Sequence, residues 1–268
     1  GAGSRAGTRC ANGSGVKVVE RMHHAERLPN VLLLDTSNQY CSVALQWRGQ
    51  LTARHEWSEQ KHSQMILPMV RELLAAQQAD FTDLDAIAVG VGPGGFTGVR
   101  LAVSVAQGLA FAAHKPVLAL SSLAALAVAG LSHSAETQII VAMDARMQQV
   151  YWAHYEWREG ELIARVEPSL DDVAVFVDRL NLIDTPCVLV GNAIEAFDVI
   201  QQAIMQANDR VPLRVAEIDH SAPHAADFAP LVNRLWSNGA WQAGVALCPE
   251  QVQPLYVRDK VAKTIAER

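Results

Sequence analysis

The sequence predicts an α/β protein in which one architecture occurs twice. Two segments, 31–45 (VLLLDTSNQYCSVAL) and 139–155 (IIVAMDARMQQVYWAHY), each run from a buried apolar strand through a turn that contains an aspartate into a second strand. In the first half, strands then alternate with helices. The chain has 268 residues, half of them hydrophobic, which is enough to bury two compact units. We therefore expect a duplicated α/β fold with two domains, each a mixed sheet flanked by helices.

The first half reads as a three-strand meander followed by strand-to-helix steps. Strands are expected near 31–34, 41–45 and 51–57, with a turn at Arg48 and Gly49 before the third. A helix at 63–78 is predicted by an apolar stripe, which tolerates Pro68 only in or near the first turns. A buried strand at 84–92 leads into a helix at 98–113. A strand at 115–122 then leads, with Ser121 or Ser122 as cap, into a helix that ends near 129.

The second half repeats the opening pattern and then becomes less regular. Strands are expected within 138–157 and 185–192, a helix at 227–242, and a short extended segment from 253. We expect residues 1–29 to be an expression-derived, disordered leader. Residues 30–125 form an N-terminal domain, residues 126–260 a C-terminal domain, and residues 261–268 a polar tail.

Composition excludes several classes of function. With 22 basic and 28 acidic residues and no concentrated run of lysine and arginine, tight autonomous RNA binding is disfavoured. The four cysteines, Cys10, Cys41, Cys187 and Cys248, form no C-x-x-C pair, which favours a reducing compartment. We find no apolar run that approaches the 18 to 20 residues of a membrane span, and no secretory signal. The chain is therefore expected in the cytoplasm, without a membrane partner.

A glycine-rich loop at 90–98 (GVGPGGFTG) invites a phosphate-binding interpretation. Gly90, Gly92 and Gly95 match the dinucleotide fingerprint, but no acidic residue stands between Asp85 and Glu136 to hold a ribose. A P-loop interpretation fails because Phe96 stands where the phosphate-binding lysine belongs. We expect the loop to shape the entry of the next helix instead, with glycines that let strand and helix backbones approach closely.

The start of that helix carries its own predictions. Thr97 is expected as N-cap, with Phe96 and Leu101 as a hydrophobic staple beside the glycines of the loop, Gly92, Gly94 and Gly95. Arg100 is unusual, because a cation in the first turn opposes the helix dipole. We expect an ion pair with Asp83 or Asp85; a bound anion or a partner's carboxylate is the alternative.

The helix at 98–113 has no charged residue from 101 to 113. Leu101, Val105 and Leu109 form one face, and an adjoining face consists of alanines. Burial inside its own domain would explain this composition, and so would a helix from another subunit packed on the alanine face. Met65 and Met69 of the preceding helix could contribute to the same surface.

Five segments together give the chain a family resemblance: 31–45, 62–70 (HSQMILPMV), 84–111, 141–155 and 253–261 (QPLYVRDKV). They resemble the TsaB (YeaZ) family, a bacterial subunit of the machinery that makes threonylcarbamoyladenosine beside the tRNA anticodon. The resemblance covers essentially 31–260, with Gly95 where the family usually has serine. It implies the duplicated fold of actin, Hsp70 and sugar kinases, and a role without catalysis.

The resemblance also implies partners. TsaB-like chains pair with the catalytic paralogue TsaD through helices of the N-terminal domain, and TsaD and the ATPase TsaE carry out the transfer. ATP and metal are therefore expected on the partner subunits, with no intrinsic cofactor here, and tRNA only through the complex. Alone, the chain is expected to form a homodimer through the same surface. The interface is predicted on two helices, at Met65, Met69, Leu73, Leu101, Ala102, Val105, Ala106, Leu109 and Ala110.

Three enzymatic or metal-binding alternatives stay open. Asp35 and Asp144 occupy the two turns where kinases and ATPases of this fold hold magnesium and phosphates, although they can also cap those turns. His220 and His224 have a metal-ligand spacing, but Pro223 prevents a regular helix and no third ligand is evident. A peptidase would need Ser104, Ser121 or Cys41 as nucleophile, and no motif supplies its base.

Overall fold

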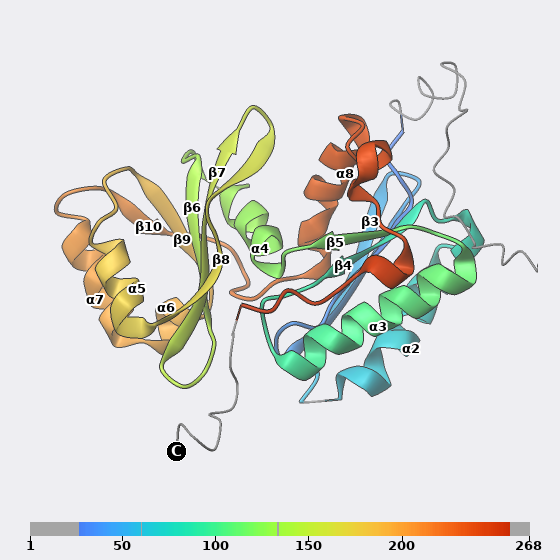
Figure 1. The fold of residues 1–268 in the computed structure, drawn as a ribbon, viewed down its shortest axis with the longest axis horizontal. Helices are drawn as coiled ribbons and strands as arrows, with labels where there is room; N and C mark the ends of the chain where they lie inside the picture. The colour runs from blue at the N-terminus through green and yellow to red at the C-terminus, as the bar shows by residue number, and fades with distance from the viewer. Residues whose placement is uncertain (1–26, 60, 133, 258–268) are drawn as a thin grey trace, which may run out of the picture.

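The computed structural model describes residues 27–59, 61–132 and 134–257, and it contains two five-stranded mixed sheets side by side (Figure 1). The first sheet has the order β3-β2-β1-β4-β5 and the second the order β10-β9-β6-β7-β8. In each sheet the first three strands form an antiparallel meander, the fourth pairs in parallel with the first strand, and the fifth pairs in parallel with the fourth. The duplicated α/β fold predicted from the sequence is therefore confirmed.

Ten strands build these sheets. Those of the first are β1 (Val31–Asp35), β2 (Tyr40–Trp47), β3 (Gln50–Trp57), β4 (Ala86–Gly90) and β5 (Val117–Leu120). Those of the second are β6 (Gln138–Asp144), β7 (Gln149–Arg158), β8 (Glu161–Asp172), β9 (Cys187–Val190) and β10 (Leu213–Val215). The central strands β1 and β4 are buried along their whole length, as their unbroken apolar sequences predict.

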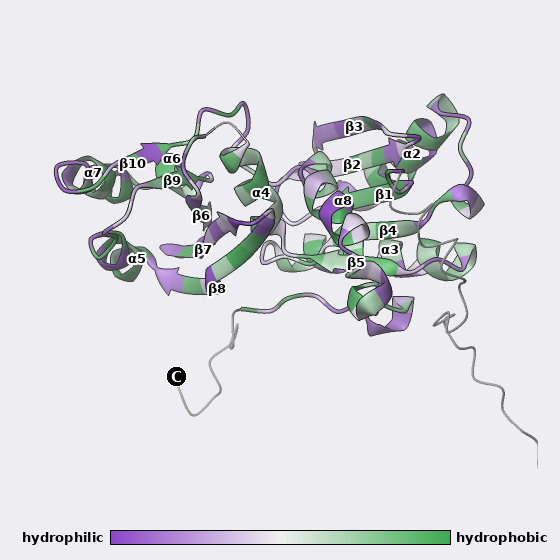
Figure 2. Cartoon of the chain, turned by 90° about the horizontal axis from the view of Figure 1, so that it is seen from above, coloured by the Kyte–Doolittle hydropathy of each residue, from purple (hydrophilic) through white to green (hydrophobic). Residues whose placement is uncertain are grey.

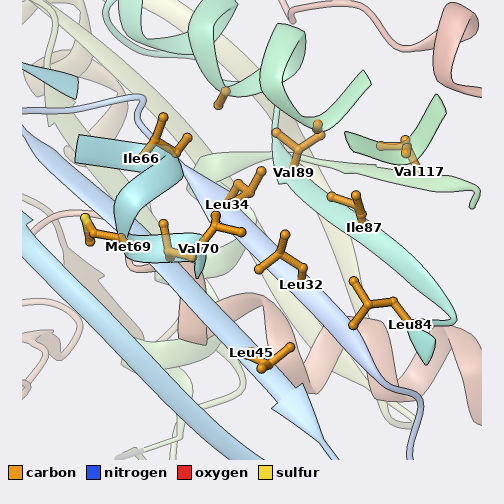
Figure 3. Packing of buried hydrophobic residues seen from close by; sticks show 14 of the residues in the cluster. Leu32, Leu34, Leu45, Ile66, Met69, Val70, Leu84, Ile87, Val89 and Val117 are labelled. Carbon is orange, nitrogen blue, oxygen red and sulfur yellow. The ribbon is translucent and has the colours of Figure 1, made fainter. Parts of the chain in front are cut away.

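Two helices cover one face of the first sheet. They are α2 (His62–Ala76) and α3 (Phe96–Ala113), and the short helix η1 (Phe81–Asp83) lies between them in sequence. Figure 3 shows Val70 of α2 beside Leu34 of β1, and Ile66, Met69 and Leu32 belong to the same buried cluster. Pro68 lies inside α2, in its second turn, which agrees with the expected place in or near the first turns.

The opposite face of the first sheet is covered by the end of the chain. Helices η2 (Ala225–Phe228) and α8 (Ala229–Ser237) pack on the β1, β2 and β4 side chains that point away from α2 and α3. The chain then continues through η3 (Trp241–Val245) and η4 (Pro249–Gln251), and Leu247 pairs with Val117 at the edge of the sheet. The contiguous C-terminal domain expected at 126–260 is therefore wrong in its last part, because residues from 225 onward return to the first sheet.

Helix α4 (Ser122–Leu131) lies between the two sheets, as seen from above in Figure 2. Leu123, Leu126 and Ala127 pack on the second sheet, whereas Ala125 packs with the first. The other face of the second sheet is covered by α5 (Val173–Leu180) and α7 (Asp198–Ala207), with α6 (Ala193–Ala196) at its edge. Strands β8 and β10 and these three helices were not predicted from the sequence.

One expectation about membranes is wrong, namely that no apolar run approaches the length of a membrane span. Helix α3 has 18 residues with a mean hydropathy of 1.4, so by length and composition it could span a bilayer. In this fold it lies along a sheet, and Val99, Ala102, Val103, Ala106 and Ala110 are buried there. Cys41 and Cys187 are free thiols in the cores of the two sheets.

Candidate functional site

The glycine loop is packed against the turn between β1 and β2. A Cβ atom on Gly90 would lie 2.0 Å from Asp35 Oδ2, one on Gly94 would lie 2.3 Å from the Ser37 carbonyl oxygen, and one on Gly98 would lie 2.0 Å from the Thr36 carbonyl oxygen. No side chain fits at such distances. Gly94 and Gly98 therefore allow two backbone segments to touch, and Gly90 leaves room for the Asp35 carboxylate.

Hydrogen bonds fix this contact. The Gly95 N–H donates to the Ser37 carbonyl at 2.7 Å, and Thr36 Oγ1 donates to the Gly98 carbonyl at 2.7 Å. The Ser122 N–H donates to the Gly92 carbonyl at 2.9 Å. The β1–β2 turn thus lies directly against the glycine loop and supplies hydrogen-bond partners for two of its backbone groups. These bonds fix the entry of the chain into α3, which is the role expected for this loop.

Asp35 is the buried centre of this arrangement. It is fully buried, and its carboxylate accepts hydrogen bonds from the Ser37 N–H at 2.8 Å, the Ser37 hydroxyl at 2.7 Å and the Ser122 hydroxyl at 2.6 Å. Burial raises the pKa of this carboxyl above its usual value, against the effect of the three donors. Its oxygens are committed to the protein, so Asp35 caps its turn.

Asp144 has the equivalent position after β6. Its carboxylate accepts the Arg146 N–H at 2.8 Å and lies 3.7 Å from the Arg146 guanidinium, while its own N–H donates to Asn192 Oδ1 at 2.8 Å. The interpretation that both aspartates cap turns is confirmed. For the kinase alternative, this means that the Asp35 carboxylate is not presented as a free magnesium ligand, whereas Asp144 has one oxygen held by a backbone N–H.

The start of α3 differs from its prediction. The N-cap is Gly95, which supplies no side-chain hydrogen bond, and Thr97 is an exposed residue of the first turn. Thr97 as N-cap and the staple of Phe96 with Leu101 are therefore wrong. The physical reason is that backbone bonds to the β1–β2 turn already fix the entry of the chain into the helix.

The expected ion pair of Arg100 is also wrong. Asp85 is engaged by Arg27 in two hydrogen bonds of 2.8 Å. Arg100 Nε instead donates to the Tyr256 hydroxyl at 2.7 Å, and its guanidinium lies 3.7 Å from the centre of the Phe96 ring. In the sequence, the only indication of this contact was the extended segment QPLYVR, which contains Tyr256.

The predicted alanine interface is buried inside its own domain. Ala102, Ala106 and Ala110 have no exposed surface and pack on the sheet, and Met69 and Leu73 of α2 are buried with them. Of the two explanations, burial inside the protein's own domain is thus correct for these five residues, and packing against a helix of another subunit is not. They cannot contact another chain unless α2 and α3 leave the sheet.

The accessible side of α3 is a different set of residues. Ser104, Gly108, Phe111 and Ala112 are exposed, and we call them the outer face of α3. A Cβ atom on Gly108 would meet nothing within 4 Å, so nothing inside the described chain requires a glycine there. Met65, Leu101, Val105 and Leu109 of the predicted interface lie at its margins, partly buried. Phe111 is 73% exposed, and Leu67 on neighbouring α2 is 38% exposed.

His220 and His224 belong to a column of stacked rings. The His224 ring lies between those of His220 and His55, with ring centres 3.9 and 3.3 Å away, and Tyr40 stacks on His55 at 4.3 Å. Stacked imidazoles direct their nitrogens sideways rather than toward one point. Among the residues that the structure describes, no group of three or more histidine, cysteine or acidic side chains has the geometry to hold a metal.

The structure also places the candidate nucleophiles. Cys41 is buried, and burial raises the pKa of its thiol to about 12. Ser121 lies 3.5 Å from the Tyr155 hydroxyl, and Ser104 is exposed on α3. Ser58 contacts His62 at 3.0 Å, but Ser58 is buried and the ring's other contact is a backbone carbonyl, that of Asn38. Among the residues that the structure describes, no acid contacts this imidazole, so the pair lacks the third member of a catalytic triad there.

Comparison with known proteins supplies the family. The family model described as "TsaD: tRNA N6-adenosine threonylcarbamoyltransferase" matches residues 55–265. The tRNA threonylcarbamoyladenosine biosynthesis protein TsaB of Escherichia coli (strain K12) is 32% identical over 238 residues, which are 87% of this chain and 96% of that protein. TsaB of Haemophilus influenzae is 43% identical over 159 residues, covering 53% of this chain and 67% of its own length. The chain belongs to the TsaB (YeaZ) family.

Solved structures agree with this family. YeaZ from Pseudomonas aeruginosa has a TM-score of 0.65 and 32% identity, and the match covers 85% of this chain and 100% of that one. An uncharacterized Pseudomonas aeruginosa protein "with similarity to peptidase YEAZ" has a TM-score of 0.67 and 35% identity, with coverages of 86% and 100%. The resemblance inferred from the motifs is confirmed. As a TsaB protein, the chain belongs to a family of tRNA threonylcarbamoyladenosine biosynthesis.

Proposed function

We propose that this chain is the non-catalytic subunit that docks on a TsaD-like catalytic paralogue and supports its transfer of a threonylcarbamoyl group to tRNA. The observation that carries the proposal is the outer face of α3, an exposed, uncharged helix surface with an open glycine at its centre. A helix surface exposed to water ordinarily carries charges. Small residues at 104, 108 and 112 let a second helix approach closely.

The neighbouring side chains strengthen this choice of surface. Phe111 and Leu67 are exposed apolar groups beside the small residues, and Met65, Leu101, Val105 and Leu109 surround them half-buried. Burying them against a partner would remove apolar area from water. A stable contact needs about 1,200–2,000 Å² in total, which the combined surfaces of α2 and α3 could supply. TsaE-like ATPase and tRNA would then join through the complex, in the cytoplasm.

A charged residue in the middle of this surface tests the docking. In Gly108→Arg the new side chain enters open space, so the subunit should keep its fold, yet an unpaired charge would face the partner. We expect at least a 100-fold loss of affinity for the TsaD-like paralogue of the same organism in isothermal titration calorimetry. The same variant should abolish any homodimer in analytical ultracentrifugation, because both assemblies would use this face.

Met205→Arg is the matched control for that experiment. Met205 is 72% exposed on α7, which packs on the second sheet, so an arginine there adds the same charge on a different surface. This variant should bind like the unmodified chain. Undiminished binding by a folded Gly108→Arg subunit would contradict the docking proposal.

The alternative function is an autonomous ATPase or small-molecule kinase, and the loop geometry argues against it. The β1–β2 turn packs closely against the glycine loop, and the Asp35 oxygens are bonded to Ser37 and Ser122. We therefore expect the isolated chain with ATP and magnesium to release phosphate no faster than the buffer blank. Sustained phosphate release that scales with protein concentration and survives further purification would restore the kinase interpretation.

A further inference from the structure

At the N-terminal end of α3, three side chains from two distant parts of the sequence form one exposed cluster. Phe96 and Arg100 belong to the first turns of α3, whereas Tyr256 belongs to the extended segment 252–257 that runs beside this helix (Figure 1). Two further bonds hold that segment: Gln107 Nε2 donates to the Val252 carbonyl at 3.1 Å, and the Leu255 N–H donates to the Val91 carbonyl at 2.7 Å.

The cluster holds its guanidinium in a fixed position. The Arg100 Cζ atom lies 3.7 Å from the Phe96 ring centre and 5.6 Å from the Tyr256 ring centre, and Nε donates to the Tyr256 hydroxyl at 2.7 Å. Within the described part of the chain, the two terminal nitrogens of Arg100 have neither a hydrogen bond nor an ion pair. A guanidinium whose plane is already fixed loses little entropy when a carboxylate binds to its free edge.

No negative charge of the helix compensates this cation. The first turn of α3 contains no acidic residue, and its N-cap contributes no side-chain hydrogen bond. The positive end of the helix dipole and the guanidinium therefore lie together. Phe96 and Tyr256 are 54% and 51% exposed, and exposed aromatic rings around an arginine are the composition of energetic centres in protein interfaces.

The cluster is continuous with the outer face of α3. Residues 96, 100, 104 and 108 succeed one another at four-residue spacing, so they lie along one side of the helix. A partner that covers Ser104 and Gly108 would reach Arg100 within about one helical turn.

We propose that Arg100, held between Phe96 and Tyr256, binds an aspartate or glutamate side chain of the same TsaD-like partner and so fixes which way the partner lies along α3. This inference rests on the proposed docking function. The occupant is a carboxylate because two free guanidinium nitrogens match its two oxygens. Tyr256 is a positioning residue: its hydroxyl accepts the hydrogen bond from Arg100 Nε and so orients the guanidinium, and this hydrogen bond does not involve the partner's carboxylate.

Binding measurements with the intact paralogue test this assignment. We expect Arg100→Glu to weaken the complex about 100-fold and Arg100→Gln about 10-fold, with a smaller dependence of affinity on salt in Arg100→Gln. Tyr256→Phe keeps the ring and removes the bond to Nε, so its loss should be several-fold. Arg214→Glu, on exposed β10 of the second sheet, is the matched charge-reversal control and should bind normally.

A cross-linking experiment identifies the acid directly. Arg100→Lys places a primary amine at the same point, and a carbodiimide should join it to a partner aspartate or glutamate, as read by mass spectrometry. Undiminished affinity of Arg100→Glu would overturn the assignment, and so would a loss confined to tRNA binding. If Gly108→Arg weakens docking while Arg100→Glu does not, the docking function stands and only this inference fails; if neither weakens it, both fail.

Discussion

Gly98→Ala should destabilise the chain by about 3 kcal/mol, at the upper end of the cost of overpacking a core. The added methyl group would lie 2.0 Å from the Thr36 carbonyl oxygen, which is backbone and cannot turn aside. Either α3 must move away from the sheet or the β1–β2 turn must shift, and both break the hydrogen bond from Thr36 Oγ1 to the Gly98 carbonyl. Urea unfolding followed by circular dichroism measures the loss.

The same substitution ten residues later provides the control. Gly108 lies in the same helix, and a methyl group there meets nothing within 4 Å. Alanine at a helix interior is favoured over glycine by about 0.5–1 kcal/mol, so Gly108→Ala should raise the stability of the isolated chain. Equal effects of the two variants would show that the glycines of this segment are not distinguished by backbone contact.

The contrast between these glycines shows what the sequence could predict. Strict apolar runs such as 31–34 and 86–90 predict buried strands because burial on both sides allows no other composition. For the glycine loop, the sequence favours a structural role over a phosphate cradle, since the residues that such chemistry needs are absent. Its true neighbour, the turn at Asp35 to Ser37, lies about 55 residues earlier in the chain, and no local pattern reveals a contact at that distance.

The residues predicted for the docking surface were wrong for a related reason. Helical periodicity groups Ala102, Ala106 and Ala110 on one side of α3, but periodicity does not say which side meets the sheet. Alanines allow a close approach to the protein's own strands as well as to a partner helix. In the structure they are buried against the first sheet. The return of residues from 225 onward to the first sheet was likewise invisible, because it is a long-range pairing.

Lowering the pH from 7 to 5 should destabilise the chain through the stacked rings of Tyr40, His55, His224 and His220. Burial and the neighbouring imidazoles lower the pKa of His55 to about 3 and that of His224 to about 4. The unfolded chain takes up these protons near pH 6.5, whereas the folded chain does not. Their contribution is therefore fully present above about pH 6.5 and is lost as the pH falls.

Other charged groups around the stack modify this effect. Burial lowers the pKa of His220, but its hydrogen bonds to Asp227 and Asp219 outweigh burial, so its pKa is raised on balance and its contribution has the opposite sign. Asp35, after β1, interacts with Asp227 electrostatically. After allowance for this compensation and for solvent screening, we expect a net loss of about 2 kcal/mol by pH 5.

The variant His55→Phe isolates the contribution of the stacked rings to the pH dependence from that of the other titrating groups. The phenyl ring can keep the place between Tyr40 and His224, has nothing to protonate, and removes His55 Nδ1, a buried nitrogen for which the described residues supply no hydrogen-bond partner. The variant should gain about 1 kcal/mol at pH 7 and lose less stability toward pH 5. Thermal unfolding of both proteins across this range measures the difference. Parallel curves of stability against pH would mean that the acid sensitivity comes from other groups. The two curves can diverge only if His55 binds a proton in the unfolded chain and not in the folded chain.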